Sequence, residues 1–522
     1  MKCFADRPAT LDDLFTSAAR RFPDGEALVA GSDRLSYRDL DVRVSLVASG
    51  IRSLGLKDGQ RVAFALGNRI EFVEMLLACA RIGVVAVPLN IRMRHREILH
   101  ALRDSGATAI VFETALTDQI PPVSETPACR IRIVVGDGNG ESLAYQAAFS
   151  DRELSNFVAT PAAEEAVSAI VYTSGTTGKP KGASITQIGF IHSAMSFERV
   201  AELKQGDRSV VAVPASHITG MAAVIYPVLH VGGCLVLMPE FRAADFVDLA
   251  VAEKCTYAFL VPAMVNLVLM KVDLSGRDLT AWRLVAFGGA PMPPATIDAI
   301  AATLPRLKLL HAYGATETTA AVTATMVPSD SSRLRQQSIG RALPCAEIRI
   351  MDEIGREVLA GRSGELWIGG PSVIASYWGN PQGSEDSLRG GFWRSGDVGW
   401  VDDDGYVFIG DRKKDMINRA GFKIYSTEVE AVLMNHPLVD FAAVVGRPDP
   451  VLGEKSHAFV VGSIGSELET IRDYCATQLS DYKIPDAFTV IDGEDLPRNA
   501  SGKVLKAALR ERLLAEQPNV KA

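Results

Sequence analysis

Apolar residues recur along this chain at two spacings, and each spacing predicts a type of secondary structure. Residues 10–22 show helical spacing, and a second helix is expected to begin within Leu35–Leu40. Apolar runs of strand length occur at Arg61–Leu66 and Val84–Leu89, with a helical run, Ile70–Ile82, between them. A strand, a helix and a strand in this order predict two parallel strands of one sheet.

The same order returns later in the chain. A strand is expected at Ser209–Val213, a helix at Met221–Leu229 and another strand at Cys234–Met238. Three strand-then-turn segments follow, with strands at Tyr257–Val261, Leu284–Phe287 and Leu307–Leu310. Ligands gather at the carboxyl ends of strands in α/β sheets, so the turns after these strands are expected to form a pocket wall. The second and third turns contain Gly289, Ala290, Pro291, His311, Ala312, Tyr313 and Gly314.

The pattern changes in the last third of the chain. Short alternating runs at Glu347–Met351, Gly364–Ile368 and Tyr406–Ile409 favour an antiparallel, barrel-like subdomain. Asp411–Asp415 is dense in charge between apolar strands, which indicates a hinge.

These patterns predict an α/β fold with two domains. Residues 1–411 are expected to form a large N-terminal domain of two doubly wound sheets plus the barrel-like subdomain, and residues 412–522 a small, mobile α+β C-terminal domain. Residues 113–165 are interpreted as surface connections.

Composition and charge narrow the class of protein. With 522 residues, 48% hydrophobic and 22% charged, the chain has the profile of a globular protein of two or more domains. A net charge of −8 without a long basic run argues against nucleic acid as a partner and favours small molecules. Seven cysteines without a C-x-x-C pair indicate neither a disulfide framework nor a zinc site, and the N-terminus lacks the apolar core of a signal peptide. Both observations favour the cytoplasm.

Residues 221–238 are uncharged over a length that raises a membrane helix as an alternative. Pro227, His230 and the pair Gly232-Gly233 interrupt this run. We interpret it as buried core and expect no membrane span.

A loop rich in hydroxyls and glycines follows the apolar residues 166–172. Glycines let backbone N–H groups approach an anion closely, while hydroxyls and lysines add donors and charge, so the loop is expected to bind a polyphosphate. A Walker A loop would require Gly at Thr173 and Ser or Thr at Pro180, and a solvated surface loop is the remaining alternative. The binding residues are expected to be Thr173, Ser174, Gly175, Thr176, Thr177, Gly178 and Lys179.

The stretch Val171–Gly182 resembles the phosphate loop of the AMP-forming adenylate synthetases, a superfamily of acyl-CoA synthetases, amino-acid adenylation domains and firefly-type luciferases. Segments similar to further motifs of that superfamily follow in the expected order, at Tyr313–Glu317, Gly391–Gly399 and Leu496–Val504. The resemblance covers essentially the whole chain and implies binding of ATP.

The resemblance also implies roles for single residues. Tyr313–Glu317, which includes Ala315 and Thr316, matches the segment that closes over the nucleotide, and Glu317 is expected to bind Mg²⁺. A glutamate that caps the next helix is the structural alternative. Asp397 matches the aspartate that accepts hydrogen bonds from the ribose hydroxyls, and Arg412 matches an arginine that contacts the same ribose.

Lys503 lies in the segment similar to the family's mobile lysine loop. An ammonium group between the attacking carboxylate and the α-phosphate stabilises charge that develops in the transition state. Hinge motion of the small domain is expected to deliver and withdraw Lys503. After withdrawal, the face that contains Gly421 is expected to form the tunnel for the pantetheine arm of coenzyme A.

The acid is expected to bind near Pro214–Gly220, which matches the family segment whose histidine or aromatic side chain gates the carboxylate. His217 occupies that place, and a histidine satisfied within the core is the alternative. Residues 211–238 contain no Asp, Glu, Lys or Arg. An apolar monocarboxylic acid therefore fits best, because an amino group or a second carboxylate would need a charged partner.

The sequence thus predicts an ATP-dependent acid:CoA ligase that forms an acyl-adenylate and then an acyl-CoA thioester. Lys503, Glu317, Thr173 and His217 are expected to act in catalysis, with ATP, Mg²⁺ and coenzyme A as cofactors. Transfer to a carrier protein is the alternative, and a non-catalytic nucleotide-binding protein would be expected to have lost Glu317 or Lys503. Both an alkyl and an aryl acid fit the sequence, and a homodimer is the alternative to a monomer.

Overall fold

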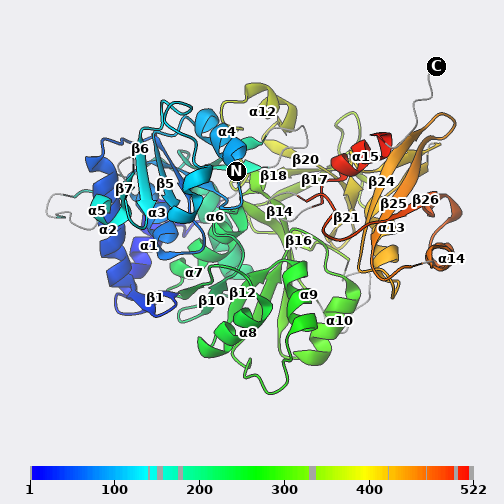
Figure 1. Ribbon diagram of the computed structural model, residues 1–522, viewed down its shortest axis with the longest axis horizontal. Helices are drawn as coiled ribbons and strands as arrows, with labels where there is room; N and C mark the ends of the chain where they lie inside the picture. The colour runs from blue at the N-terminus through cyan, green and yellow to red at the C-terminus, as the bar shows by residue number, and fades with distance from the viewer. Residues whose placement is uncertain are drawn as a thin grey trace. The chain divides into compact units, whose positions relative to one another are not determined.

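The computed structural model describes residues 3–138, 142–149, 154, 157–160, 162–173, 180–327, 337–420, 422–465, 467–498 and 504–515 (Figure 1). The chain forms two compact units. The first comprises Met1–Met292, Thr296–Ile348 and Ile368–Arg394, and the second comprises Pro293–Ala295, Arg349–Trp367 and Ser395–Ala522.

A seven-stranded sheet in the first unit has the order β7-β6-β5-β3-β4-β8-β9, and its paired strands are parallel except for β8 and β9. The expected strand–helix–strand unit is confirmed, because α3 (Ile70–Arg81) connects β3 to the parallel strand β4. The interpretation of residues 113–165 as surface connections is wrong in part, since β6 is mostly buried and extends this sheet. The strands are β3 (Arg61–Ala65), β4 (Val85–Leu89), β5 (Ala109–Glu113), β6 (Ile131–Val135), β7 (Leu143–Ala144), β8 (Val167–Thr173) and β9 (Lys181–Thr186).

A nine-stranded sheet has the order β16-β15-β14-β13-β12-β10-β11-β1-β2. The second predicted unit is confirmed in outline, because β10 and β11 are parallel neighbours. Its connecting helix is a π-helix, η2 (Gly220–Ile225), followed by a short α7 (Tyr226–His230). The strands are β1 (Glu26–Ala30), β2 (Asp33–Ser36), β10 (Arg208–Val211), β11 (Cys234–Leu237), β12 (Tyr257–Leu260), β13 (Leu284–Phe287), β14 (Lys308–Ala315), β15 (Ala320–Met326) and β16 (Arg341–Ala342).

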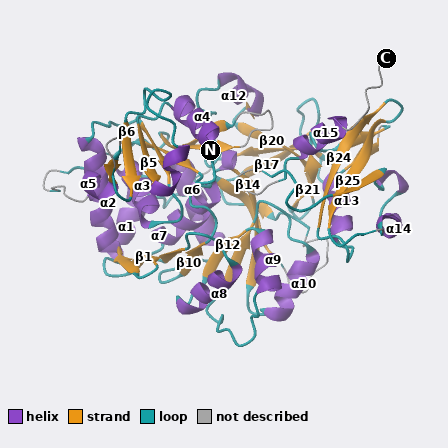
Figure 2. Ribbon diagram, in the orientation of Figure 1, coloured by secondary structure: helices purple, strands orange, loops and turns teal. Residues whose placement is uncertain are grey.

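The two sheets share one hydrophobic core. Side chains alternate between the faces of a strand, so Val62 and Phe64 of β3 join the shared core while Ala63 and Ala65 join a core on the outer face. The shared core also contains residues of α1 (Leu11–Arg21), α2 (Tyr37–Ser53), α3, α6 (Gln187–Val200), η2 and α7. The outer face of the seven-stranded sheet packs against α4 (His95–Ser105), and that of the nine-stranded sheet against α8 (Ala243–Ala252), α9 (Pro262–Lys271) and α10 (Pro294–Thr303) (Figure 2). The helices therefore lie in layers on both faces of each sheet.

The expected barrel-like subdomain corresponds to a five-stranded sheet with the order β17-β18-β20-β19, in which β21 also pairs with β20. Its strands are β17 (Glu347–Met351), β18 (Gly364–Gly369), β19 (Leu388–Arg389), β20 (Phe392–Val401) and β21 (Val407–Arg412). No helix in the described part of the chain is both long and apolar enough to cross a membrane.

The C-terminal part of the second unit has its own sheet, with the order β23-β22-β25-β24 and β26 beside β25. One face packs against α13 (Ser426–Met434) and α14 (Leu468–Gln478), and the other against α15 (Lys506–Ala515). The strands are β22 (Ile417–Arg419), β23 (Phe422–Ile424), β24 (Phe441–Asp449), β25 (Gly453–Val461) and β26 (Ala487–Val490).

One buried amide joins the strand ends of the two large sheets. Asn68, 5% exposed, follows β3 of the seven-stranded sheet. Its Nδ2 lies 2.8 Å from the carbonyl oxygen of Val211 and 3.0 Å from that of Met238, which end β10 and follow β11. Its Oδ1 accepts the backbone N–H of Ala215 at 2.7 Å. Asn68 thus provides hydrogen bonds to buried main-chain groups at the ends of β10 and β11 and in the segment after β10.

We expect Asn68→Ala to lower the free energy of unfolding by about 2–4 kcal/mol, because several buried backbone groups lose their partner at once. Denaturant unfolding and thermal melting measure this loss. Asn435→Ala, at an exposed asparagine, is the control and should leave stability nearly unchanged. Equal stability of the two variants would contradict the role given to Asn68.

Candidate active site

The predicted phosphate loop connects two antiparallel strands. β8 ends at Thr173 and β9 begins at Lys181, and these residues are register partners. The Thr173 hydroxyl lies 3.4 Å from the Lys181 carbonyl oxygen. Ser174, Gly175, Thr176, Thr177, Gly178 and Lys179 lie outside the described residues. The two strands therefore bring both ends of the loop together, which is the geometry that a loop closing around an anion requires.

The predicted pocket wall comes from the neighbouring strands β13 and β14. Gly289–Pro291 follows β13 and is exposed. The expectation of a turn at His311–Gly314 is wrong, because β14 continues to Ala315 by pairing with the antiparallel strand β15. A Cβ at Gly314 would lie 1.8 Å from the Ala320 carbonyl oxygen, so only glycine allows this close pairing.

Two histidines of the prediction have lowered pKa values. The His311 ring stacks on Phe287 at 4.7 Å, its Nδ1 lies 3.1 Å from the Ser338 carbonyl oxygen, and burial lowers its pKa to about 4. His217 is half-buried, its Nδ1 accepts the backbone N–H of Thr219 at 3.3 Å, and burial lowers its pKa. Both imidazoles are therefore neutral at pH 7. Neutral His217 carries its proton on Nε2, which can donate to a carboxylate.

Gly220 makes the turn around His217 compact. A Cβ at Gly220 would lie 2.5 Å from the carbonyl oxygen of Pro214, the first residue of the turn. The π-helix η2 begins at this glycine, so the turn packs directly against it. Every residue of η2 is buried.

Glu317 lies in the short 3₁₀-helix η3 (Thr316–Thr318), directly after β14. Its Oε1 accepts a hydrogen bond from the Tyr377 hydroxyl at 2.8 Å. The alternative role as a helix cap does not apply, because Thr318 donates and accepts the capping hydrogen bonds with Ala315. Tyr377 is absent from the residues selected in the sequence; it lies 60 positions from Glu317, and no local pattern signals a contact over that separation.

Asp397 and Arg412 are partners within the second unit. Antiparallel pairing of β20 and β21 places them opposite each other, and Arg412 Nε lies 3.1 Å from Asp397 Oδ1. The Asp397 side chain is 7% exposed, whereas that of Arg412 is 39% exposed. Asp397 is thus a strand residue, and its carboxylate stands beside a partly exposed guanidinium group.

The predicted hinge is attached to α15 by a buried polar network. Asp411 Oδ2 accepts the Ser426 hydroxyl at 2.6 Å, and Lys506 Nζ donates to the same hydroxyl at 2.6 Å. Lys506 also pairs with Glu430 at 2.7 Å. Gly421 and Lys503 lie outside the described residues, but Lys506 follows Lys503 by three positions in the sequence. The network therefore links the strand that ends in Arg412 to the helix that follows the lysine loop.

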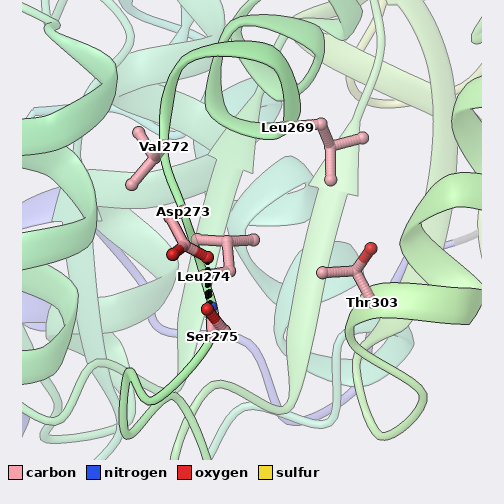
Figure 3. Close-up of a pocket in the computed structure, with 6 residues that line it drawn as sticks. All are labelled: Leu269, Val272, Asp273, Leu274, Ser275 and Thr303. Atoms are coloured by element: carbon pink, nitrogen blue, oxygen red, sulfur yellow. Dashed lines mark hydrogen bonds between the residues drawn. The ribbon is translucent and has the colours of Figure 1, made fainter.

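One cavity, of about 350 Å³, lies apart from these residues (Figure 3). The Asp273 carboxylate is already engaged by the Ser275 hydroxyl. The cavity contains none of the residues predicted for binding or catalysis. Its lining residues are Leu269, Val272, Asp273, Leu274, Ser275 and Thr303.

The donor set fits Mg²⁺ bound with a nucleotide better than a metal bound by protein alone. Within the described residues, no group of three or more His, Cys, Asp and Glu side chains could hold a metal ion. Mg²⁺ commonly uses one or two carboxylates together with phosphate oxygens and water. Glu317 offers one carboxylate on η3, which contacts β9, the strand that leaves the phosphate loop.

Comparison with known proteins identifies the family of the chain. The family model described as AMP-binding enzyme matches residues 15–378, and the model described as AMP-binding enzyme C-terminal domain matches residues 428–503. The chain is 33% identical to a feruloyl-CoA synthase of Amycolatopsis sp over 499 residues, which cover 95% of this chain and 97% of the relative. It is 35% identical to the fatty acid–[acyl-carrier-protein] ligase ScoC of Streptomyces coeruleorubidus over 515 residues, 96% of each chain.

Solved structures of the o-succinylbenzoate CoA synthetase MenE from Bacillus subtilis have the same fold. The complex with the acyl-adenylate intermediate OSB-AMP gives a TM-score of 0.84 at 27% identity and covers 97% of this chain and 98% of the other. The complex with ATP and magnesium ion gives a TM-score of 0.83 at 28% identity and covers 96% and 99%. Because the family models match most of the chain and the relatives cover almost all of it, the chain belongs to the family of AMP-binding enzymes.

Proposed function

We propose that this protein is an ATP-dependent acid:CoA ligase that activates an apolar monocarboxylic acid. The chain is an AMP-forming acyl-CoA synthetase by family and by its relatives. The observation that carries the proposal, in a chain of this family, is that Tyr377 connects two residues. These are Glu317 and Lys181, the first residue of the strand that leaves the phosphate loop. ATP and Mg²⁺ are bound by a solved relative, and coenzyme A is the acceptor named for others.

In the first step, a carboxylate oxygen of the acid attacks the α-phosphorus of ATP, and the bond to pyrophosphate breaks. The loop from Thr173 to Lys179 holds the phosphates with hydroxyl and backbone N–H groups. Lys503 stabilises the charge that develops between carboxylate and phosphate, while Asp397 and Arg412 bind the ribose. Glu317 would hold Mg²⁺, which would supply positive charge to neutralise the phosphates.

In the second step, the thiolate of coenzyme A attacks the acyl carbon, and the bond to AMP breaks. This step requires that Lys503 leave and that the face with Gly421 take its place, which hinge motion at Asp411–Asp415 provides. The domain boundary after residue 411 belongs to this proposal, with residues 412–522 as the moving part. Because the reaction draws on ATP and CoA, we also place the protein in the cytoplasm.

The substrate class follows from burial and charge. Residues 211–238 contain no acidic side chain, lysine or arginine, and most of them are buried. An acid with a second charge would lose hydration there without a partner. Neutral His217 can donate one hydrogen bond to the reacting carboxylate. The relatives include a feruloyl-CoA synthase and a fatty acid ligase, so both aryl and alkyl acids belong to the proposal.

Transfer of the acyl group to a carrier protein is the second candidate. The similarity to ScoC, an acyl-carrier-protein ligase at 35% identity, favours it. The first step is the same for both acceptors, so residues of the adenylation site do not distinguish them. Only the second step does.

The proposal predicts pyrophosphate release from ATP with at least one alkyl or aryl acid, and a strong increase of turnover when CoA is added. Lys503→Ala should slow the first step by about 100-fold or more. It should leave transfer from preformed acyl-adenylate to CoA largely intact. A coupled pyrophosphate assay over a panel of acids measures both effects. Stoichiometric pyrophosphate without a response to CoA would favour the carrier protein, and silence on every acid would overturn the substrate class.

A second prediction concerns the ribose site. Asp397→Asn should raise the KM for ATP by about 10-fold or more, because a charged acceptor for the ribose hydroxyls is lost. Discrimination between ATP and 2′,3′-dideoxy-ATP should shrink in the same variant. Asp440→Asn, at an exposed aspartate, is the control. Undiminished discrimination in Asp397→Asn would place the ribose elsewhere.

A further inference from the structure

Tyr377 contacts both charged groups that border the proposed phosphate site. Its hydroxyl donates to Glu317 Oε1 at 2.8 Å, and Lys181 Nζ lies over its ring, 5.0 Å from the centroid. The side chain is buried, with 6% of the residue exposed. The phenol hydroxyl is the donor in this pair, because an ionised carboxylate can only accept hydrogen bonds.

The backbone around Tyr377 is hydrogen-bonded to β9, which contains Lys181, and to η3, which contains Glu317. The Trp378 N–H donates to the Gly182 carbonyl at 2.7 Å, and the Ser184 N–H donates to the Ser376 carbonyl at 3.1 Å. Both bonds pair this segment with β9. On the other side, the Ile374 N–H donates to the Glu317 carbonyl at 2.9 Å. The segment therefore holds η3 and the strand after the phosphate loop at a set separation.

These contacts engage only one of the two carboxylate oxygens of Glu317. Within the described part of the chain, Glu317 Oε2 has no hydrogen-bond partner, whereas Oε1 is held by Tyr377. A carboxylate that binds a metal through one oxygen is oriented by a hydrogen bond to the other. The phenol is a suitable donor, because it is neutral and does not compete with the cation for charge.

We propose that Tyr377 is a positioning residue for metal binding: it orients the Glu317 carboxylate so that Oε2 faces the Mg²⁺ of the bound nucleotide. This inference rests on the proposed role of Glu317 as metal ligand. It adds a residue that neither the phosphate loop nor the Tyr313–Glu317 motif contains.

Tyr377→Phe tests the inference, because phenylalanine keeps the ring under Lys181 and removes only the hydroxyl. We expect the Mg²⁺ concentration for half-maximal adenylate formation to rise about 10-fold. Calorimetric titration with ATP, with and without Mg²⁺, gives a readout that needs no turnover, and the gain in ATP affinity from Mg²⁺ should shrink by a similar factor.

Tyr37→Phe is the matched control. Tyr37 is also buried, and its hydroxyl donates to the carbonyl oxygens of Leu229 and Gly233 at 3.0 and 2.7 Å, so its loss should reduce stability without changing the Mg²⁺ dependence. In a Glu317→Gln background, Tyr377→Phe should have little further effect on Mg²⁺.

An unchanged Mg²⁺ dependence in Tyr377→Phe would overturn the positioning role, as would equal effects of Tyr377→Phe and Tyr37→Phe. An unchanged dependence in Glu317→Gln would remove Glu317 as metal ligand, and the inference with it. Mg²⁺-dependent ATP binding without turnover of any acid would overturn only the proposed substrate class, because the calorimetric comparison still decides the role of Tyr377.

Discussion

The layer of helices between the two large sheets is largely buried, and a charged group inside it needs a partner within the protein. Eleven of the twelve residues of α3 are buried, including Glu74 and Arg81. Glu74 pairs with Arg43 and accepts the Tyr145 hydroxyl at 2.7 Å, although burial raises its pKa. Unpaired, such a carboxylate would destabilise the fold strongly. The shared core therefore admits very few arrangements of the two sheets.

This constraint also positions the candidate site. The strands β8 and β14 belong to different sheets, yet the segments that follow them, β9 and η3, are in contact. Asn68 joins the ends of β3, β10 and β11 in the same way, through hydrogen bonds to backbone groups near the ends of these strands. The strand that follows the predicted phosphate loop and the segment that contains Glu317 are thus brought together by regular elements of the two sheets.

Within the first unit, a neutral ring separates two side chains of opposite charge. Tyr377 lies between Lys181 and Glu317, and contacts each through a different part of its side chain. Direct pairing of these two residues would neutralise both charges at once, whereas the proposed function needs each of them for the nucleotide and its metal ion. Asp397 and Arg412 do form an ion pair, and here the pairing leaves the guanidinium partly exposed. The Arg412 guanidinium group therefore remains available to a charged ligand.

Local patterns were sufficient to predict much of this protein. Val62 and Phe64 lie in an apolar run whose alternation and length identify β3, and the glycines and hydroxyls after residue 172 indicate a phosphate loop without any knowledge of the fold.

Gly314 shows where this reasoning failed: a glycine after a short strand predicts a turn, but β15 pairs with the same residues and extends β14 through it. The strand β6 was missed because its core partners lie on other elements. Tyr377 could not be found at all, since its contacts with Glu317 and Lys181 join residues that are distant in the sequence. The sequence by itself determines the type of each element and the chemistry of its motifs, because both depend on neighbouring residues. Which elements pair, and which side chains complete the site, depends on long-range packing and becomes visible only in the folded chain.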